Sequence, residues 1–200
     1  MSARQATKAT VFGLAAVLVA VPALLCNLEK RLYAGDLVFL LCGQCLALVP
    51  GYPGVLLRAA FHSLTLEQCA WQVHIGFGTL FMHRGARVAQ RVSTGAYCVL
   101  GHVTLGEGVR LASRVSIPSG KRQHLDEHGR LSDTNQFDRV SVGAGAWVGE
   151  GAIVLADVGS GSIVSAGAVV VNALPAQCLV GGNPARVLRE LPASPAQGTA

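Results

Sequence analysis

Residues 142–154 read VGAGAWVGEGAIV and repeat with a period of six residues. An aliphatic residue followed by glycine opens each unit, and alanine stands four positions after each opening residue. A period of six is neither that of a helix nor that of a plain strand alternation. It is typical of a parallel β-solenoid, in which each unit forms one flat wall and three walls form a coil. We therefore predict an all-β solenoid with the opening aliphatic residues pointing inward.

The same period continues on both sides of this stretch, although one step between Leu100 and Leu105 is short by a residue. At this short step we predict that the side chain of Thr104 points into the interior of the solenoid. Twelve opening positions at three per coil give four coils, and Ile75 with Phe81 adds an imperfect first one. We predict about five coils over residues 75–191. The alternative, a sandwich of short strands, requires two-residue alternation and hairpin turns such as Asn-Gly, which the sequence lacks.

The repeat is interrupted once, from residue 118 to residue 139. This excursion carries ten charged or histidine side chains inside a domain that otherwise has few. A long loop costs chain entropy and buries little, so an insertion of this length is usually functional. A merely solvated loop is the alternative. Its histidines have an unperturbed pKa near 6.5, which suits a general base, and His124 with His128 has the i, i+4 spacing of a helical metal pair. No third ligand is placed by sequence, so we expect no metal.

The N-terminal region is strongly apolar, and the whole chain is 51% hydrophobic with 14% charged residues. Residues 9–28 and 37–57 contain no charge, and the second run is broken by Pro50-Gly51-Tyr52-Pro53. The first run is long enough to cross a bilayer as a helix. We predict a membrane-associated helical segment at 1–58, either spanning or lying on the membrane, a connection at 59–74, and a disordered tail at 192–200. A cleavable signal peptide is disfavoured because Leu24 and Leu25, not small residues, precede Cys26.

Cysteine and charge usage exclude two other classes of protein. The six cysteines are scattered, and we interpret Cys42-Gly43-Gln44-Cys45 as a coincidence within an apolar helix, because no second pair accompanies it. The net charge is +5 and the isoelectric point is near 9.1. The basic residues form no stripe and aromatic residues are sparse, so we expect no nucleic-acid partner.

Several of these features occur together in one known family. They are the hexapeptide units, the Ser119-Gly120 and Gln123-His124 pairs of the loop, Trp147-Val148-Gly149-Glu150, and GGNPARV at residues 181–187. Over residues 75–191 the chain resembles the hexapeptide-repeat acyltransferases, and it is most similar to polysaccharide-biosynthesis acetyltransferases of the colanic acid type. The resemblance implies a left-handed β-helix, a homotrimer and an active site between subunits. The period alone does not select a hand, and most parallel crossovers are right-handed.

The resemblance also implies roles for particular residues. His124 matches the general base that activates an acceptor hydroxyl for attack on acetyl-coenzyme A, the co-substrate. Glu150 and Asp138 are candidates for orienting its imidazole. The residues that match coenzyme-binding positions are Trp147, Ala166, Gly167, Asn183, Arg186 and Arg189.

The predicted function is acetyl-coenzyme A-dependent O-acyl transfer to a sugar hydroxyl of a surface polysaccharide precursor, either a glycan or a lipid-linked glycan. Because acyl-coenzyme A is cytoplasmic, we expect the enzyme at the cytoplasmic face of the inner membrane. The alternatives are a serine or other small-molecule acetyltransferase, a γ-carbonic-anhydrase-like metalloprotein, and a non-catalytic scaffold. His83 and His102 are weaker candidates for contacts with the acceptor, because structural histidines are commoner.

Overall fold

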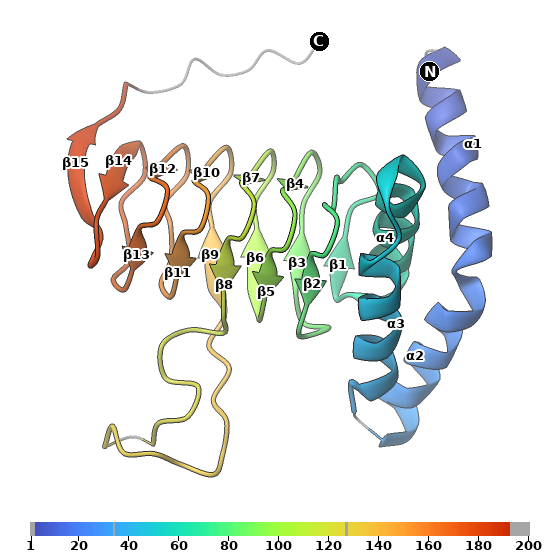
Figure 1. The fold of residues 1–200 in the computed structure, drawn as a ribbon, viewed down its shortest axis with the longest axis horizontal. Coiled ribbons are helices and arrows are strands. Elements are labelled where there is room, and N and C mark those ends of the chain that lie inside the picture. Colours follow the sequence, from blue (N-terminus) through green and yellow to red (C-terminus); the bar gives the residue numbers. More distant parts are fainter. Residues whose placement is uncertain (1–2, 34, 127, 193–200) are drawn as a thin grey trace.

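The computed structural model describes residues 3–33, 35–126 and 128–192. Four helices lie at one end of a long β-solenoid, and one loop projects from its side (Figure 1). The predicted tail falls almost entirely on residues 193–200, which lie outside the described residues. The helices are α1 (Ala3–Leu18), α2 (Ala20–Tyr33), α3 (Leu37–Ala47) and α4 (Gly51–Thr65).

Three parallel sheets form the walls of the solenoid, and β15 (Arg186–Glu190) pairs antiparallel with the last strand of the second face. The first face contains β1 (Gln68–Cys69), β3 (Arg87–Val88), β6 (Val103–Leu105) and β9 (Val140–Val142). The second face contains β4 (Ser93–Thr94), β7 (Arg110–Leu111), β10 (Trp147–Val148), β12 (Ile163–Val164) and β14 (Cys178–Gly181). The third face contains β2 (Leu80–Phe81), β5 (Val99–Leu100), β8 (Ser116–Ile117), β11 (Ile153–Val154) and β13 (Val169–Val170).

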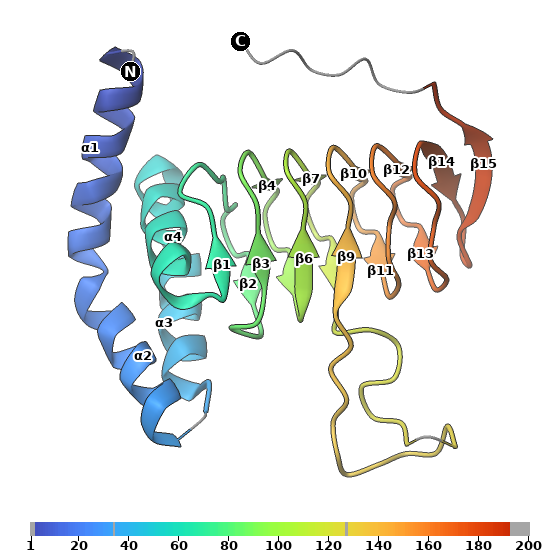
Figure 2. The same cartoon turned by 180° about the vertical axis from the view of Figure 1, so that it is seen from behind.

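The predicted β-solenoid is confirmed, with slightly more coils than the five expected. Single-residue bridges extend the ladders, so that the described part of the chain has six levels on the first and second faces and five on the third. From the helical end, the chain rises along the first face, passes over the top and descends along the other two (Figures 1 and 2). This turn is left-handed as it advances toward β15.

The interior consists of the predicted opening residues, stacked coil on coil. Leu100, Leu111 and Val148 are buried, as are the small residues that follow at the second inward positions. The placement of Thr104 was wrong. In β6 the alternating residues Val103 and Leu105 are buried and Thr104 points outward, because neighbouring strand residues face opposite sides. Glycine after an opening residue permits close stacking: a Cβ on Gly149 would come within 2.5 Å of the Ala166 nitrogen.

The helices close the first end of the solenoid, with α3 against β2 and α4 against β1. The helical part continues to Thr65, beyond the predicted end at residue 58, and the first strand starts at Gln68, before the predicted start at 75. Arg58 explains the difference. Its buried guanidinium donates to the carbonyl oxygens of Ile75, at 2.9 Å, and Val49, at 2.8 Å. A charge that appears to end the apolar run therefore joins α4 to α3 and to the first coil.

Helices α1 and α2 form one bent rod instead of the single helix expected over residues 9–28. The rod bends by 60° at Val19. Pro22 accounts for the break, because its ring clashes with the carbonyl of the residue four positions earlier and it lacks an N–H group. Among the described helices, none alone has the length and apolarity to cross a membrane, whereas this bent pair meets those criteria taken together.

Candidate active site

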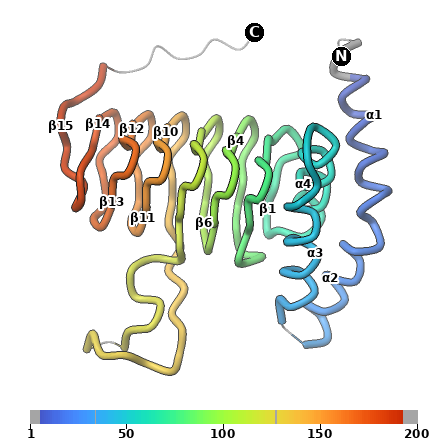
Figure 3. The backbone as a smooth tube through the Cα atoms, viewed as in Figure 1, coloured from blue at the N-terminus to red at the C-terminus, as the bar shows by residue number. Residues whose placement is uncertain are grey.

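The loop of residues 118–139 leaves the end of β8 and returns at the start of β9 (Figure 3). Both ends lie on what we call the return edge, where turns lead from the third face back to the first. Backbone hydrogen bonds tie its two arms together: Asp138 N donates to Ser119 O at 3.1 Å, and Gln136 N donates to Gln123 O at 3.0 Å. The excursion is therefore a closed hairpin-like structure that stands on the solenoid.

The outgoing arm carries the predicted base, His124. Its backbone carbonyl accepts from Ser132 N at 2.9 Å, and its side chain is exposed. Earlier on this arm, Lys121 Nζ donates to Val171 O at 3.4 Å, so the arm leans toward the later coils. Within the described residues, no hydrogen bond joins the imidazole of His124 to a carboxylate.

The returning arm packs against the earlier coils. The ring of Phe137 lies 4.2 Å from the ring of His83, centroid to centroid, and its carbonyl oxygen lies 3.2 Å from His102 Nδ1. Two residues later, Arg139 pairs with Glu67 at 2.8 Å. The loop thus separates two regions of the return edge, with His124 on the arm toward the later coils and Phe137 on the arm toward the helices.

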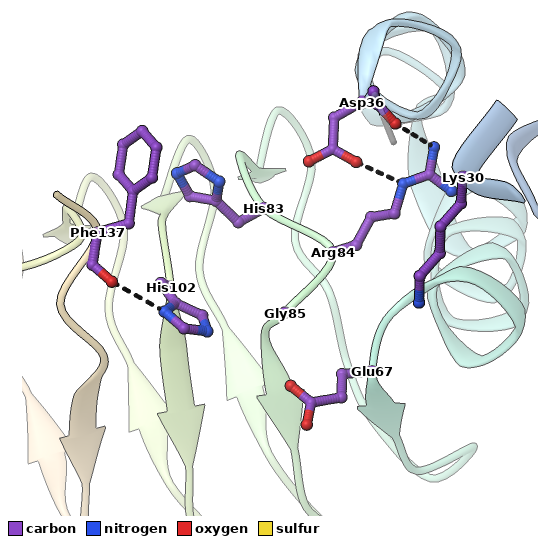
Figure 4. Close-up of a pocket in the computed structure, with 9 residues that line it drawn as sticks. Lys30, Asp36, Glu67, His83, Arg84, Gly85, His102 and Phe137 are labelled. Carbon is purple, nitrogen blue, oxygen red and sulfur yellow. Dashed lines mark hydrogen bonds and ion pairs between the residues drawn. The ribbon is translucent and has the colours of Figure 1, made fainter. Parts of the chain in front are cut away.

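A cleft of about 530 Å³ lies between the returning arm and the helices (Figure 4). Four parts of the chain form it: the end of α2 with the α2–α3 connection, the α4–β1 connection, the turns of the return edge and the loop. The cleft is lined by Lys30, Gly35, Asp36, Glu67, His83, Arg84, Gly85, His102 and Phe137.

Ion pairs neutralise most of the charge in this cleft. Arg84 pairs with Asp36 and with Glu29, each at 2.5 Å. Hydrogen bonds from Arg87 and Arg139 lower the pKa of Glu67 to about 2. Burial lowers the pKa of His83 below its usual value, with Asp36 opposing the shift. His83 therefore faces the cleft as a neutral imidazole that can donate and accept hydrogen bonds.

Neither predicted orienting carboxylate contacts His124 within this chain. Asp138 lies in the loop and pairs with Arg122 at 3.3 Å. Glu150 pairs with Arg114 at 2.7 Å, at the turns from the second to the third face, which we call the middle edge. Because the loop stands on a different edge, one chain does not bring Glu150 and His124 together.

The predicted coenzyme positions lie along the second face and the middle edge. Strand register places Trp147, Ile163 and Leu179 side by side on one row, with Arg189 of β15 at its end. Trp147 is 50% exposed, and Arg189 is also exposed. This outward row combines an aromatic ring and aliphatic side chains with a terminal guanidinium, which suits a long, partly apolar ligand that ends in phosphates.

The remaining coenzyme candidates adjoin this row. Gly167 N donates to Glu150 O at 2.8 Å, so the turn of Ala166 and Gly167 stacks directly on the preceding turn of the middle edge. Asn183 lies in the connection from β14 to β15, and Arg186 of β15 pairs with Gly181 of β14. Both side chains are exposed at the end of the solenoid. The predicted coenzyme residues thus share one region, apart from the cleft.

His83 and His102 were predicted together as weaker candidates for contacts with the acceptor, but the cleft that they line was not predicted. Leu80 pairs with Val99, and His83 and His102 each lie three residues after these partners. Equal offsets from paired residues place both side chains on consecutive turns of the return edge. The equal spacing from paired strand residues could have predicted that the two histidines lie side by side. The contributions of Asp36 and Phe137 come from distant segments that no local pattern connects.

Within the described residues, no group of three or more histidine, cysteine, aspartate or glutamate side chains is placed to hold a metal ion. His124 and His128 are both exposed, and Leu125 and Asp126, the described residues between them, are not helical. The loop therefore does not present the i, i+4 helical pair that the spacing allowed.

Comparisons with known proteins identify the fold. No family profile matches the sequence, and no curated protein sequence matches it either. Among solved structures, a maltose O-acetyltransferase from Clostridium difficile 630 is similar at a TM-score of 0.68 and 19% identity, over 77% of this chain and 85% of that one. A galactoside acetyltransferase in complex with coenzyme A is similar at a TM-score of 0.50 and 16% identity, over 76% and 80%. The chain thus has the β-solenoid fold of these two acetyltransferases.

Proposed function

We propose that this protein is an acyl-coenzyme A-dependent O-acyltransferase that transfers acetyl to a hydroxyl of a sugar. The observation that carries the proposal is the single loop, which exposes His124 on one arm and walls a cleft with the other. Two proteins of the same fold act on maltose and galactoside by name, and one binds coenzyme A. Fold alone does not define an activity, so the proposal rests on the residues of the loop and of the outward row on the second face.

In this mechanism His124 acts as general base. Its imidazole takes the proton of the acceptor hydroxyl while the oxygen attacks the thioester carbonyl carbon. The tetrahedral intermediate then expels the thiolate, which takes up a proton, and the acetyl ester is released. Alignment of the two substrates and stabilisation of the oxyanion supply most of the acceleration, because no enzyme-bound acyl group is required.

The donor lies along the second face. Trp147, Ile163 and Leu179 offer an apolar row for the pantetheine arm, and Arg186 and Arg189 offer guanidinium groups for the phosphates. The turn of Ala166 and Gly167 forms the edge of this row. Asn183 belongs to the same end of the solenoid.

The histidine cleft lies across the loop from His124, and we propose that it holds a part of the acceptor other than the reacting hydroxyl. The imidazoles of His83 and His102 provide hydrogen-bonding groups, and the exposed ring of Phe137 provides a surface on which a sugar ring can pack. A precursor of a surface polysaccharide, free or lipid-linked, is the acceptor that we propose. The enzyme then works at the cytoplasmic face of the inner membrane, where acyl-coenzyme A is available.

A homotrimer completes the site. Strand register aligns Val99, Ser116, Ile153 and Val169 as an outward row on the third face that is aliphatic except at Ser116, and Val99 and Ile153 are about 40% exposed. Such a row is typical of a subunit interface. Association along it brings the edges of neighbouring chains together, so that Glu150 of one chain can approach the loop of the next.

The test compares His124→Ala with His128→Ala, a matched change of an exposed histidine in the same loop. Purified variants are assayed for thiol release from acetyl-coenzyme A with a panel of sugars, and the product ester is identified by mass spectrometry. Loss of a general base lowers turnover by about 10²–10⁴-fold, so we expect that loss for His124→Ala and near-normal turnover for His128→Ala. Normal turnover by His124→Ala would refute the assignment. Acetylation of free serine instead of sugars would change the acceptor class.

A further inference from the structure

The outward side of the bent rod formed by α1 and α2 is apolar along its length. Its large aliphatic side chains are between 47% and 73% exposed. They are Leu14, Val17, Leu18, Val21, Leu24, Leu25 and Leu28. The opposite side is apolar as well, since Ala15, Val19, Ala23 and Cys26 are buried against the rest of the protein. A helix that is apolar all round is normally covered on all sides.

The few polar groups in residues 9–28 are already satisfied by the protein itself. Thr10 Oγ1 donates to Ala6 O at 3.1 Å within α1, and Asn27 Nδ2 donates to Leu64 O at 3.1 Å in α4. The outward residues are all aliphatic and offer nothing to hydrogen-bond. A surface without free polar groups fits hydrocarbon better than a second protein, whose interface would be expected to include polar contacts.

Positive charge is confined to the two ends of this surface. Lys8 stands before it, and Lys30 and Arg31 stand after it, all with exposed side chains. Lysine and arginine in this position extend toward lipid phosphates while their stems remain on apolar surface. The pattern of an aliphatic centre with cationic ends is complementary to the headgroup region of an anionic bilayer.

The placement of the rod favours lying on the bilayer over crossing it. The rod lies across the end of the solenoid and bends by 60° (Figures 1 and 2). Arg84 of the solenoid pairs with Glu29 of α2 and donates to Cys26 O at 2.6 Å, and α1 packs on α4. The rod is therefore fixed along one side to the folded body, which leaves only its outward side for lipid.

We infer that the outward side of α1 and α2 rests on the surface of a bilayer that contains anionic lipid. Lys30 belongs both to the end of this surface and to the lining of the histidine cleft, so the cleft opens beside the headgroups. If the proposed acyl transfer is correct, the acceptor is amphiphilic: its lipid stays in the bilayer, part of its glycan enters the cleft, and the reacting hydroxyl extends past the loop to His124.

Flotation of the full-length protein with vesicles tests the inference. We expect the wild type to float with phosphatidylcholine vesicles and to bind several-fold more tightly when phosphatidylglycerol is added. A double variant, Leu18→Gln with Leu24→Gln, should lose at least about tenfold in partition coefficient. The matched control, Val187→Gln with Leu188→Gln, changes two exposed aliphatic residues at the far end of the solenoid and should float normally. Equal flotation of the two double variants would overturn the inference.

The depth of the rod in the bilayer distinguishes a rod that lies on the surface from one that crosses the membrane. The Leu18→Trp variant places an indole at the middle of the rod, and lipids brominated near the headgroup should quench its added fluorescence more than lipids brominated near the chain ends. The reverse order would overturn the lying orientation. A wild type that stays unbound and changes its oligomeric state in the Leu18→Gln, Leu24→Gln variant would show a protein interface instead. These measurements need no substrate, so their failure is distinguishable from failure of the acyltransferase assay.

Discussion

The solenoid and the helical end distribute charge in opposite ways. The solenoid buries valine, leucine and alanine and presents its ion pairs, such as Arg114 with Glu150, to solvent. The helical end buries Arg58 and His62, covers Arg84 of the first coil, and presents leucine and valine to the outside. A stacked solenoid is stabilised by contacts between neighbouring coils, whereas the helical end depends on a few charged hydrogen bonds. The two regions are therefore stabilised by different kinds of contact.

The largest expected effect is at Arg84. In Arg84→Ala, Glu29 is left nearly buried without its partner, and removal of one member of a buried ion pair costs about 3–5 kcal/mol. Chemical denaturation measures the free energy of unfolding. Arg87→Ala, which removes an exposed partner of Glu67, is the control and should cost less than about 1 kcal/mol. Similar losses for both variants would mean that the helical end does not depend on the buried charge.

In the solenoid, the second largest effect is expected at a buried aliphatic residue instead of a buried charge. Leu100→Ala should lower the free energy of unfolding by about 3 kcal/mol, because it removes a fully buried side chain and leaves a cavity. Leu131→Ala is the same change at a loop position that is 86% exposed, and it should be within about 0.5 kcal/mol of the wild type. A small effect at Leu100 would contradict the stacked interior.

His62 makes the helical end sensitive to pH. Burial, with a smaller contribution from Arg58, lowers its pKa to about 3, and Nδ1 has no hydrogen-bond partner. The unfolded chain takes up a proton near pH 6.5 and the folded chain does not, so stability is complete above pH 6.5 and declines as the pH falls toward 3. Between pH 7 and pH 5 we expect a loss of about 2 kcal/mol.

Unfolding at a series of pH values checks this expectation, and His62→Leu should remove most of the slope because the titrating group is gone. An equally steep slope in His62→Leu would assign the effect to other groups.

The smallest effect is expected on the solenoid surface. Glu150→Gln breaks the exposed pair with Arg114, which costs less than about 1 kcal/mol and less still in high salt. Denaturation at low and high salt measures it. A loss as large as that at Arg84 would remove the contrast between the two regions.

The inward pattern of the solenoid could be predicted because a narrow prism accepts only apolar residues at fixed intervals. Thr104 was misplaced where the interval shortens, since either it or Val103 could face inward. The six-residue period did not determine the hand of the turn, because the period is the same in left-handed and right-handed solenoids. The end of the helical part was misjudged because it was placed at Arg58, the first charge after the apolar run, whereas backbone carbonyl groups enclose that guanidinium inside the protein.

The loop of the candidate site could be predicted from its charges, but its surroundings could not. Residues of α2, the return edge and the loop meet in the histidine cleft, and contacts between segments so far apart leave no local signal. His83 and His102 lie at the same distance in sequence from paired strand residues, but this could be recognised only after the strand pairing was known. Within one chain Glu150 lies on a different edge of the solenoid from the loop that carries His124, and no local pattern predicts that separation.

The stacking of the coils also acts as a ruler. Three coils lie between the helices and the loop at residues 118–139, and each adjacent pair of strands is separated by about 4.8 Å. The number of coils before the loop therefore sets its height above the end of the solenoid. Gain or loss of one coil would raise or lower the loop by about that spacing while leaving its own residues untouched. The distance between the helices and the loop could thus change in steps of one coil without any change in the residues of the loop.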